Sequence, residues 1–193
     1  MLIDRFIGDG KCDIVPQFGH ATTVYAISDL MGIPMEDRAV LLEQIGAPPS
    51  QVGGDGPVKV GSDPLAPMKP LFDKYLSERI ESPKANLMTE LVQAKFKDGT
   101  SPDLDTLSHL ACFLFGAGQD TTSRLIAMAV LVLAERPDLQ ERLRVNPDRI
   151  PDFIEETLRF DGPVKVAYRL ATVDTNVGGV DIPAGTILTV CNA

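Results

Sequence analysis

Apolar residues recur at helical spacing along the chain up to residue 160, and this pattern predicts a succession of helices. In segment 68–80, for example, the apolar side chains fall on one face of a helix, as expected for an amphipathic helix packed on a core. The segments that we expect to be helical are 22–31, 35–45, 68–80, 86–96, 102–135, 137–145 and 151–160.

The longest of these segments is predicted to form one helix over residues 102–135. Ser101 is a suitable N-cap, Pro102 suits the first helical position, and no further proline follows until Pro137. Both halves of the segment are apolar on most sides, which is typical of a helix that runs through a protein core.

Two regions depart from the helical pattern. Glycine and proline alternate over residues 46–67, which predicts a long loop that serves either as a lid or as a linker. After Gly162, β-branched residues dominate, with turn signals at 178–179 and 183–185, so we expect a short sheet with tight turns over 164–193. The predicted fold class is therefore mainly α with a small β-sheet. Because the chain ends inside or just after a strand, we expect it to be part of a longer protein.

Composition and charge exclude several classes of protein. The formal net charge of −9 argues against a nucleic-acid-binding protein, and the 44% hydrophobic content argues against disorder. The longest apolar run, Leu125 to Ala134, is shorter than the roughly 20 residues of a membrane span, so we expect no membrane association. Three cysteines without a C-x-x-C pair, and no signal-peptide pattern at the start, favour a reducing cytoplasm.

The centre of the long predicted helix has an unusual composition between Gly116 and Thr122. A glycine inside a helix costs about 1 kcal/mol relative to alanine, so we expect a gap that lets a flat or bulky group approach the backbone. Thr121 is expected to bond to the carbonyl of Ala117 and loosen the helix. With Asp120 beside it, this turn is suited to proton delivery to a ligand.

A second interpretation of this turn needs no ligand. The glycines then allow another helix to cross closely, and Asp120 pairs with Arg124 one turn later. Residue types alone favour this second interpretation.

Four sequence motifs nevertheless occur in the order and at the spacing of a known family. The string at 117–122, Ala-Gly-Gln-Asp-Thr-Thr, resembles the A-G-x-[DE]-T-[TS] signature of the central I helix of the cytochromes P-450, the haem-thiolate monooxygenases. Glu156-Thr157-Leu158-Arg159 resembles the E-x-x-R signature of the K helix. The runs 159–164 and 178–186, with Arg169 between them, are similar to the bacterial members.

The resemblance implies an incomplete cytochrome P-450 fold. The chain corresponds to the E to K helices and part of the β region, with the I helix at 102–135, the K helix at 151–160 and a lid at 46–67. The family's N-terminal third and the loop that carries the haem ligand have no counterpart here.

The resemblance also implies a role for individual residues. Gly118 forms the groove for dioxygen, Thr121 delivers a proton, and Asp120 relays protons from solvent, so Asp120 and Thr121 are the expected catalytic residues. Glu156 and Arg159 form a structural pair, for which the plainer alternative is a surface pair of Glu155 with Arg159. The residues expected at the haem are Ala117, Gly118, Thr121 and Arg169, and those expected at the substrate are Phe113, Gly116, Ala117, Val164 and Val166.

The chain departs from the family pattern at the iron. The family's ligand is the cysteine of an F-x-x-G-x-x-x-C-x-G loop, a motif that this sequence does not contain. We therefore assign no metal ligand to Cys12, Cys112 or Cys191, and we take His20 and His109 as ordinary histidines. The later arginine that completes the family's Glu156–Arg159 network is also absent.

We therefore expect a haem-dependent monooxygenase fragment that oxidises a small apolar organic substrate. Dioxygen and electrons from NAD(P)H, passed on by a ferredoxin reductase and a ferredoxin, are the implied co-reactants, and the chain alone is expected to be inactive. The alternative is a non-catalytic helical module that binds a partner, but it does not account for the Gly-Gly-acid-Thr turn. A hydrolase built on Asp120, Thr121 and His109 is disfavoured, because His109 lies roughly 16 Å from Asp120 along the helix.

Overall fold

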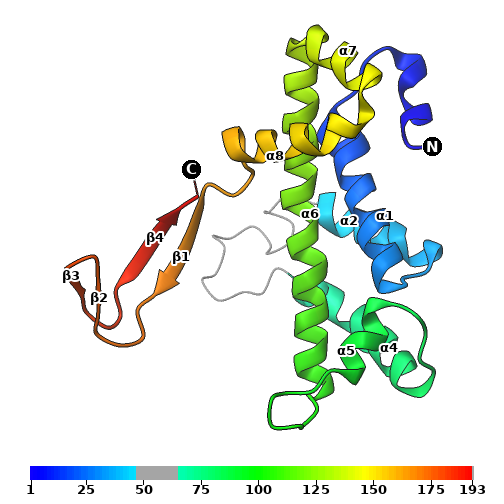
Figure 1. Cartoon of the computed structure of the whole chain (residues 1–193). Coiled ribbons are helices and arrows are strands. Elements are labelled where there is room, and N and C mark those ends of the chain that lie inside the picture. The colour runs from blue at the N-terminus through cyan, green and yellow to red at the C-terminus, as the bar shows by residue number, and fades with distance from the viewer. Residues whose placement is uncertain (47–64, 193) are drawn as a thin grey trace, which may run out of the picture. The chain divides into compact units, whose positions relative to one another are not determined.

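The computed structural model describes residues 1–46 and 65–192, and it divides the chain into two compact units, Met1–Arg124 and Leu125–Ala193 (Figure 1). Most of the predicted loop over 46–67 lies outside the described residues. Its last part is described, and Ala66–Met68 form a 3-10 turn there.

The first unit is helical, as the sequence pattern predicts. It contains α1 (His20–Met31), α2 (Arg38–Gly46), α4 (Lys69–Glu81), α5 (Leu87–Gln93) and the first part of α6 (Leu104–Glu135). A π-helical turn over Val15–Gly19 leads directly into α1. The remaining 3-10 turns are Ile3–Arg5, Ile7–Asp9 and Met35–Asp37.

The core of the first unit is formed by side chains that these helices contribute jointly. The rings of Phe72 in α4 and Phe115 in α6 are both fully buried, and their centroids lie 5.6 Å apart. Tyr75, Leu76, Met31 and Leu41 are buried in the same cluster. The early half of α6 therefore has one face in the core of this unit.

The start of α6 differs from the prediction. The helix begins at Leu104 rather than at residue 102, and the carboxylate of Asp103 accepts a hydrogen bond of 2.8 Å from the backbone N–H of Thr106. Asp103 is therefore the N-cap, and Ser101 and Pro102 precede the helix. A carboxylate caps as well as a serine hydroxyl does and adds charge that favours the positive end of the helix dipole.

The expected loosening of α6 in its centre is not observed. The hydroxyl of Thr121 donates to the carbonyl of Ala117 at 2.9 Å, as predicted, but the helix is α-helical from Leu104 to Glu135 without interruption. A carbonyl oxygen has two lone pairs, so that of Ala117 can accept a hydroxyl as well as a backbone N–H. The hydroxyl therefore does not have to break the backbone hydrogen bond.

The second unit contains the end of α6, α7 (Pro137–Val145), α8 (Ile150–Asp161) and four short strands. Strand β1 (Val166–Leu170) pairs antiparallel with β4 (Ile187–Cys191), and β2 (Thr175–Val177) pairs with β3 (Val180–Ile182). The predicted single sheet is thus two two-stranded sheets. Gly178 and Gly179, with φ of 61° and 86°, close a two-residue turn that joins only β2 to β3.

None of the described helices is long and apolar enough to cross a membrane.

Candidate functional site

One stripe of α6 in the first unit carries the residues that the sequence singled out. Phe113, Ala117 and Thr121 follow one another at intervals of one turn; Phe113 is 62% exposed, Ala117 is exposed and Thr121 is half-buried. The residues of the opposite face, among them Ala111 and Phe115, are buried in the core. The structure therefore presents an aromatic ring, a small apolar side chain and a hydroxyl on the open face of a helix whose opposite face is packed.

The two glycines of the central turn lie against neighbouring side chains. A Cβ at Gly116 would lie 2.9 Å from Cδ2 of Leu65, and a Cβ at Gly118 would lie 3.7 Å from Cδ1 of Ile27 in α1. Gly116 thus leaves room for Leu65, which is not part of a helix, whereas the contact of Gly118 with α1 is an ordinary van der Waals distance. A close crossing of two helices, the second interpretation of this turn, is therefore not observed at Gly116. The predicted roles of Gly116 at the substrate and of Gly118 at dioxygen stay predictions.

Asp120 forms an ion pair with Arg124, whose Nε donates to the carboxylate at 2.8 Å. Both side chains are exposed, so the pair contributes only about 0.3–0.5 kcal/mol to the stability of the helix. The ion pair places the exposed carboxylate next to Thr121 in the sequence of the helix.

Gln119, which lies between these residues, was not identified from the sequence. It is only 3% exposed, and its Oε1 lies 2.7 Å from the hydroxyl of Thr23 in α1. The only feature of the sequence that could have pointed to Gln119 was a polar amide within a long, mostly apolar helix. Its partner could not be foreseen, because Thr23 is far away along the chain.

In the second unit, Glu156 and Arg159 form an ion pair, and both side chains are exposed rather than buried in a network as the family resemblance implies. The guanidinium donates two hydrogen bonds to the carboxylate, from Nε at 2.7 Å and from Nη2 at 2.6 Å. These hydrogen bonds lower the pKa of Glu156 and raise the pKa of Arg159. The alternative pair of Glu155 with Arg159 is not among the ion pairs of the described residues.

The other predicted site residues of the second unit lie in and next to β1. Arg169 is exposed, and its Nη1 donates to the carbonyl of Tyr168 at 2.8 Å. Within residues 1–46 and 65–192, Arg169 forms no ion pair. Val164, just before the strand, and Val166, within it, both expose part of their side chains. These residues belong to the second unit, whereas the α6 stripe belongs to the first.

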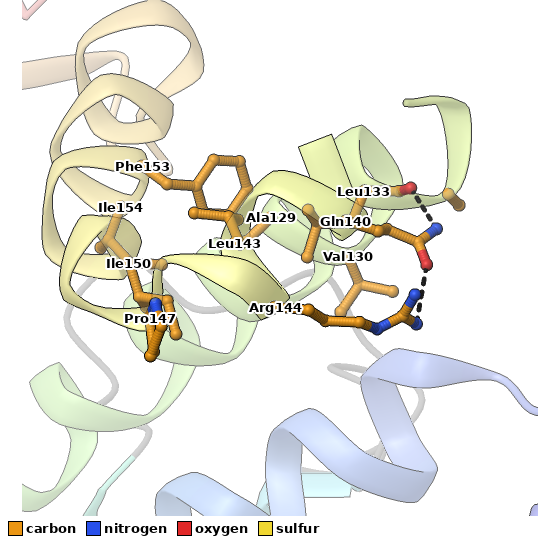
Figure 2. Close-up of a pocket in the computed structure, with 11 residues that line it drawn as sticks. Ala129, Val130, Leu133, Gln140, Leu143, Arg144, Pro147, Ile150, Phe153 and Ile154 are labelled. Carbon is orange, nitrogen blue, oxygen red and sulfur yellow. Dashed lines mark hydrogen bonds between the residues drawn. The ribbon is translucent and has the colours of Figure 1, made fainter. Parts of the chain in front are cut away.

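The second unit also contains an apolar cavity of about 650 Å³ between the end of α6, α7 and α8 (Figure 2). Leu133, Leu143 and Phe153 are among its lining residues. Gln140 spans its polar edge, because its Nε2 donates to the carbonyl of Leu133 at 2.6 Å and its Oε1 accepts from Arg144 at 3.3 Å. None of the predicted site residues lines this cavity.

The candidate metal and nucleophile residues are dispersed. Cys12 and Cys191 are exposed and Cys112 is buried, and the described residues hold no cluster of three possible metal ligands. His109 lies with its Nδ1 2.8 Å from the carbonyl of Asp105, one turn before it in α6. It therefore faces Asp105 rather than Asp120, which leaves the hydrolase hypothesis without support.

Comparison with known proteins identifies a family. The model of the family described as cytochrome P450 matches residues 66–192. A protein of Bacillus spizizenii, cytochrome P450 109, is 36% identical over 179 residues, which are 90% of this chain and 44% of that protein. The vitamin D(3) 25-hydroxylase of Pseudonocardia autotrophica is 31% identical over 178 residues, covering 92% of this chain and 43% of the relative.

A solved structure agrees with these relatives. The substrate-free cytochrome P450 CYP150A6 of Mycobacterium marinum is 37% identical and superposes with a TM-score of 0.80, covering 98% of this chain and 43% of the other. The chain thus spans less than half the length of each of these three proteins.

Proposed function

This chain belongs to the cytochrome P450 family, and on that premise we propose that it forms the central part of a haem-dependent monooxygenase. The observation that carries the proposal is the open stripe of α6, which places Thr121 next to an exposed carboxylate and in line with apolar side chains. The name of the Pseudonocardia relative supports hydroxylation of an organic molecule as the type of reaction.

The residues of this chain fit a haem group. The stripe formed by Phe113, Ala117 and Thr121 is apolar with a small residue at its centre, which suits a flat macrocycle. Arg169 has a guanidinium without a carboxylate partner in the described residues, which suits a propionate. When bound, haem with a thiolate ligand supplies the reductive activation of dioxygen. We propose Ala117, Gly118, Thr121 and Arg169 as its contacts.

Proton delivery is the role that we propose for Asp120 and Thr121. Asp120 collects protons from solvent, because its carboxylate is exposed and Arg124 holds it at the surface. Thr121 is proposed to pass a proton to a bound ligand. Its hydroxyl donates to the carbonyl of Ala117, so it would turn from that carbonyl to the ligand and take up a replacement proton as it gives up its own. A hydroxyl beside a solvent-facing acid is suited to such general acid catalysis.

Substrate and electrons complete the proposal. We propose that Phe113, Gly116, Ala117, Val164 and Val166 contact a small apolar organic substrate. Electrons would come from NAD(P)H through a ferredoxin reductase and a ferredoxin, as in bacterial members of the family. The Glu156–Arg159 pair has a structural role in this proposal.

The decisive variant is Thr121→Ala in a complete enzyme that carries this segment. We expect haem content to be unchanged but the product formed per NAD(P)H to fall about tenfold or more, with the electrons recovered as hydrogen peroxide, because a positioned acid contributes factors of this size or larger. Thr121→Ser, which retains the hydroxyl, is the matched control and should keep most of the coupling. Unchanged coupling in Thr121→Ala would contradict the proton-delivery role.

We propose further that the cysteine ligand of the iron lies outside this chain. The purified 193-residue chain, mixed with haem, reduced and exposed to carbon monoxide, should then give no thiolate-type difference spectrum. A complete enzyme carrying the same segment is the positive control. A thiolate-type spectrum from the chain alone would show that one of its own three cysteines binds the iron.

A further inference from the structure

A buried polar contact joins α6 to α1 on the face opposite the open stripe. Gln119 and Thr23 are each 3% exposed, and Oε1 of Gln119 lies 2.7 Å from Oγ1 of Thr23. One turn later, Ser123 is 1% exposed and packs on the end of the π-helical turn. A Cβ at Gly19 would lie 2.5 Å from Oγ of Ser123, so the two backbones approach closely here.

The hydrogen count at Thr23 determines how this contact can be made. The hydroxyl has one hydrogen, but its oxygen lies 3.0 Å from the carbonyl of His20 as well as 2.7 Å from the amide of Gln119. If Thr23 donates to Gln119, the buried Nε2 is left without a partner in the described residues. If Thr23 donates to His20, a half-turn of the amide lets Nε2 donate to Thr23, and Oε1 then takes the position that has no partner in the described residues.

In either orientation, the hydroxyl of Thr23 is the partner of this buried amide. Losing the partner of a buried polar group costs about 1–3 kcal/mol, so a rotation of α6 that separates them is unfavourable. Apolar side chains on the same face could slide, because their contacts have no preferred direction, whereas a hydrogen bond has one.

The turn just before Gln119 adds few contacts of its own that resist rotation, because Gly116, Ala117 and Gly118 have little or no side chain. One turn earlier, Phe115 anchors the helix by apolar packing against Phe72. Gln119 adds a directional contact to that packing. Successive residues of an α-helix are separated by about 100°, so the direction of Gln119 sets the directions of the next two residues. Those residues are Asp120 and Thr121.

We propose that Gln119 and Thr23 are positioning residues that fix the rotation of α6 and so direct Thr121 and Asp120 towards the open face. This inference rests on the proposed function, because the orientation of Thr121 and Asp120 matters for activity only if they deliver protons. The contact itself belongs wholly to the first unit and acts without touching substrate or haem.

Hydrogen exchange of the 193-residue chain tests the positioning directly. In Gln119→Leu and Thr23→Val, which keep the side-chain volume, the backbone amides of residues 120–123 should exchange about tenfold faster, the factor expected for one lost buried hydrogen bond. The amides of 72–76 in α4 should change less than twofold. Thr23→Ser should restore the original rates, and Ser123→Ala, on the same buried face, should leave them unchanged.

A uniform acceleration in both segments would mean a general loss of stability and would overturn the inference. Unchanged rates at 120–123 would overturn it as well. The double variant gives a further check, because two changes that act through one contact should together have no more effect than either alone.

The consequence for activity is measured separately in the complete enzyme. Thr23→Val should lower the product formed per NAD(P)H without changing the KM for substrate, and it should have no further effect when combined with Thr121→Ala. If Thr121→Ala alone leaves coupling unchanged, the proposed function fails, whereas the exchange rates still decide the positioning role. If Thr121→Ala lowers coupling and Thr23→Val does not, the positioning inference fails and the proposed function stands.

Discussion

Phe115→Ala is expected to lower the free energy of unfolding by about 3–5 kcal/mol, the usual cost of removing a buried aromatic ring. The ring is fully buried and packs against that of Phe72 at a tilt of 58°, so its removal leaves a cavity between α4 and α6. These helices are separated by α5 and a loop, and the ring pair is a principal contact between them. Equilibrium denaturation with urea, followed by circular dichroism, measures the loss.

The same helix provides a matched control two residues earlier. Phe113 is 62% exposed, so Phe113→Ala should change the free energy of unfolding by less than about 0.5 kcal/mol. The two variants remove the same atoms from one helix and differ only in burial. If they destabilised the chain equally, the assignment of the buried and open faces of α6 would be wrong. In a complete enzyme, Phe113→Ala should instead weaken substrate binding.

Gly32→Ala is the second substitution with a large expected effect, a loss of about 2–3 kcal/mol. Gly32 ends α1 in the left-handed region with φ of 72°, where its N–H bonds to Asp29 and the next N–H bonds to Ser28 at 2.8 Å. A Cβ there would collide with Nδ2 of Asn86. Asn86 cannot move away without cost, because its side chain caps α5 by accepting from the N–H of Thr89.

Gly99→Ala separates the two parts of this cost. Gly99 also has a positive φ, 86°, but a Cβ there meets nothing within 4 Å. Gly99→Ala should therefore lower the free energy of unfolding only by the cost of placing alanine in the left-handed region, about 1 kcal/mol. Thermal unfolding of both variants measures the difference, which reports the collision with Asn86. Equal losses would show that Asn86 moves aside freely.

Local signals explain most of the agreement between sequence and structure. Helical spacing of apolar residues predicted α1, α4 and α8 to within two residues at either end. Each of these helices buries one face, and the residues of that face recur every three or four positions in the sequence. The start of α6 was misplaced, since Ser101 and Asp103 are both acceptable caps. Which of these two nearby residues caps the helix depends on the direction in which the chain enters it. That direction is not determined by the local sequence.

The β region shows the same limit. The turn at Gly178 and Gly179 was correctly predicted, because a two-residue hairpin turn needs positive φ at both positions. The pairing of β1 with β4 was not predicted. Those two strands are far apart in the sequence, with β2 and β3 between them. The sequences of the strands do not indicate which strand pairs with which.

The sequence by itself determined the helical elements and, through the motifs at 117–122 and 156–159, the family to which the chain belongs. Only the tertiary structure decided which face of α6 is buried and what Gln119 contacts, because its partner Thr23 is 96 residues away and the hydrogen bond exists only once α1 and α6 pack. The spacing of apolar residues within a segment indicates which face of that segment is buried. It does not indicate which distant segment covers that face, since that depends on the packing of the whole unit.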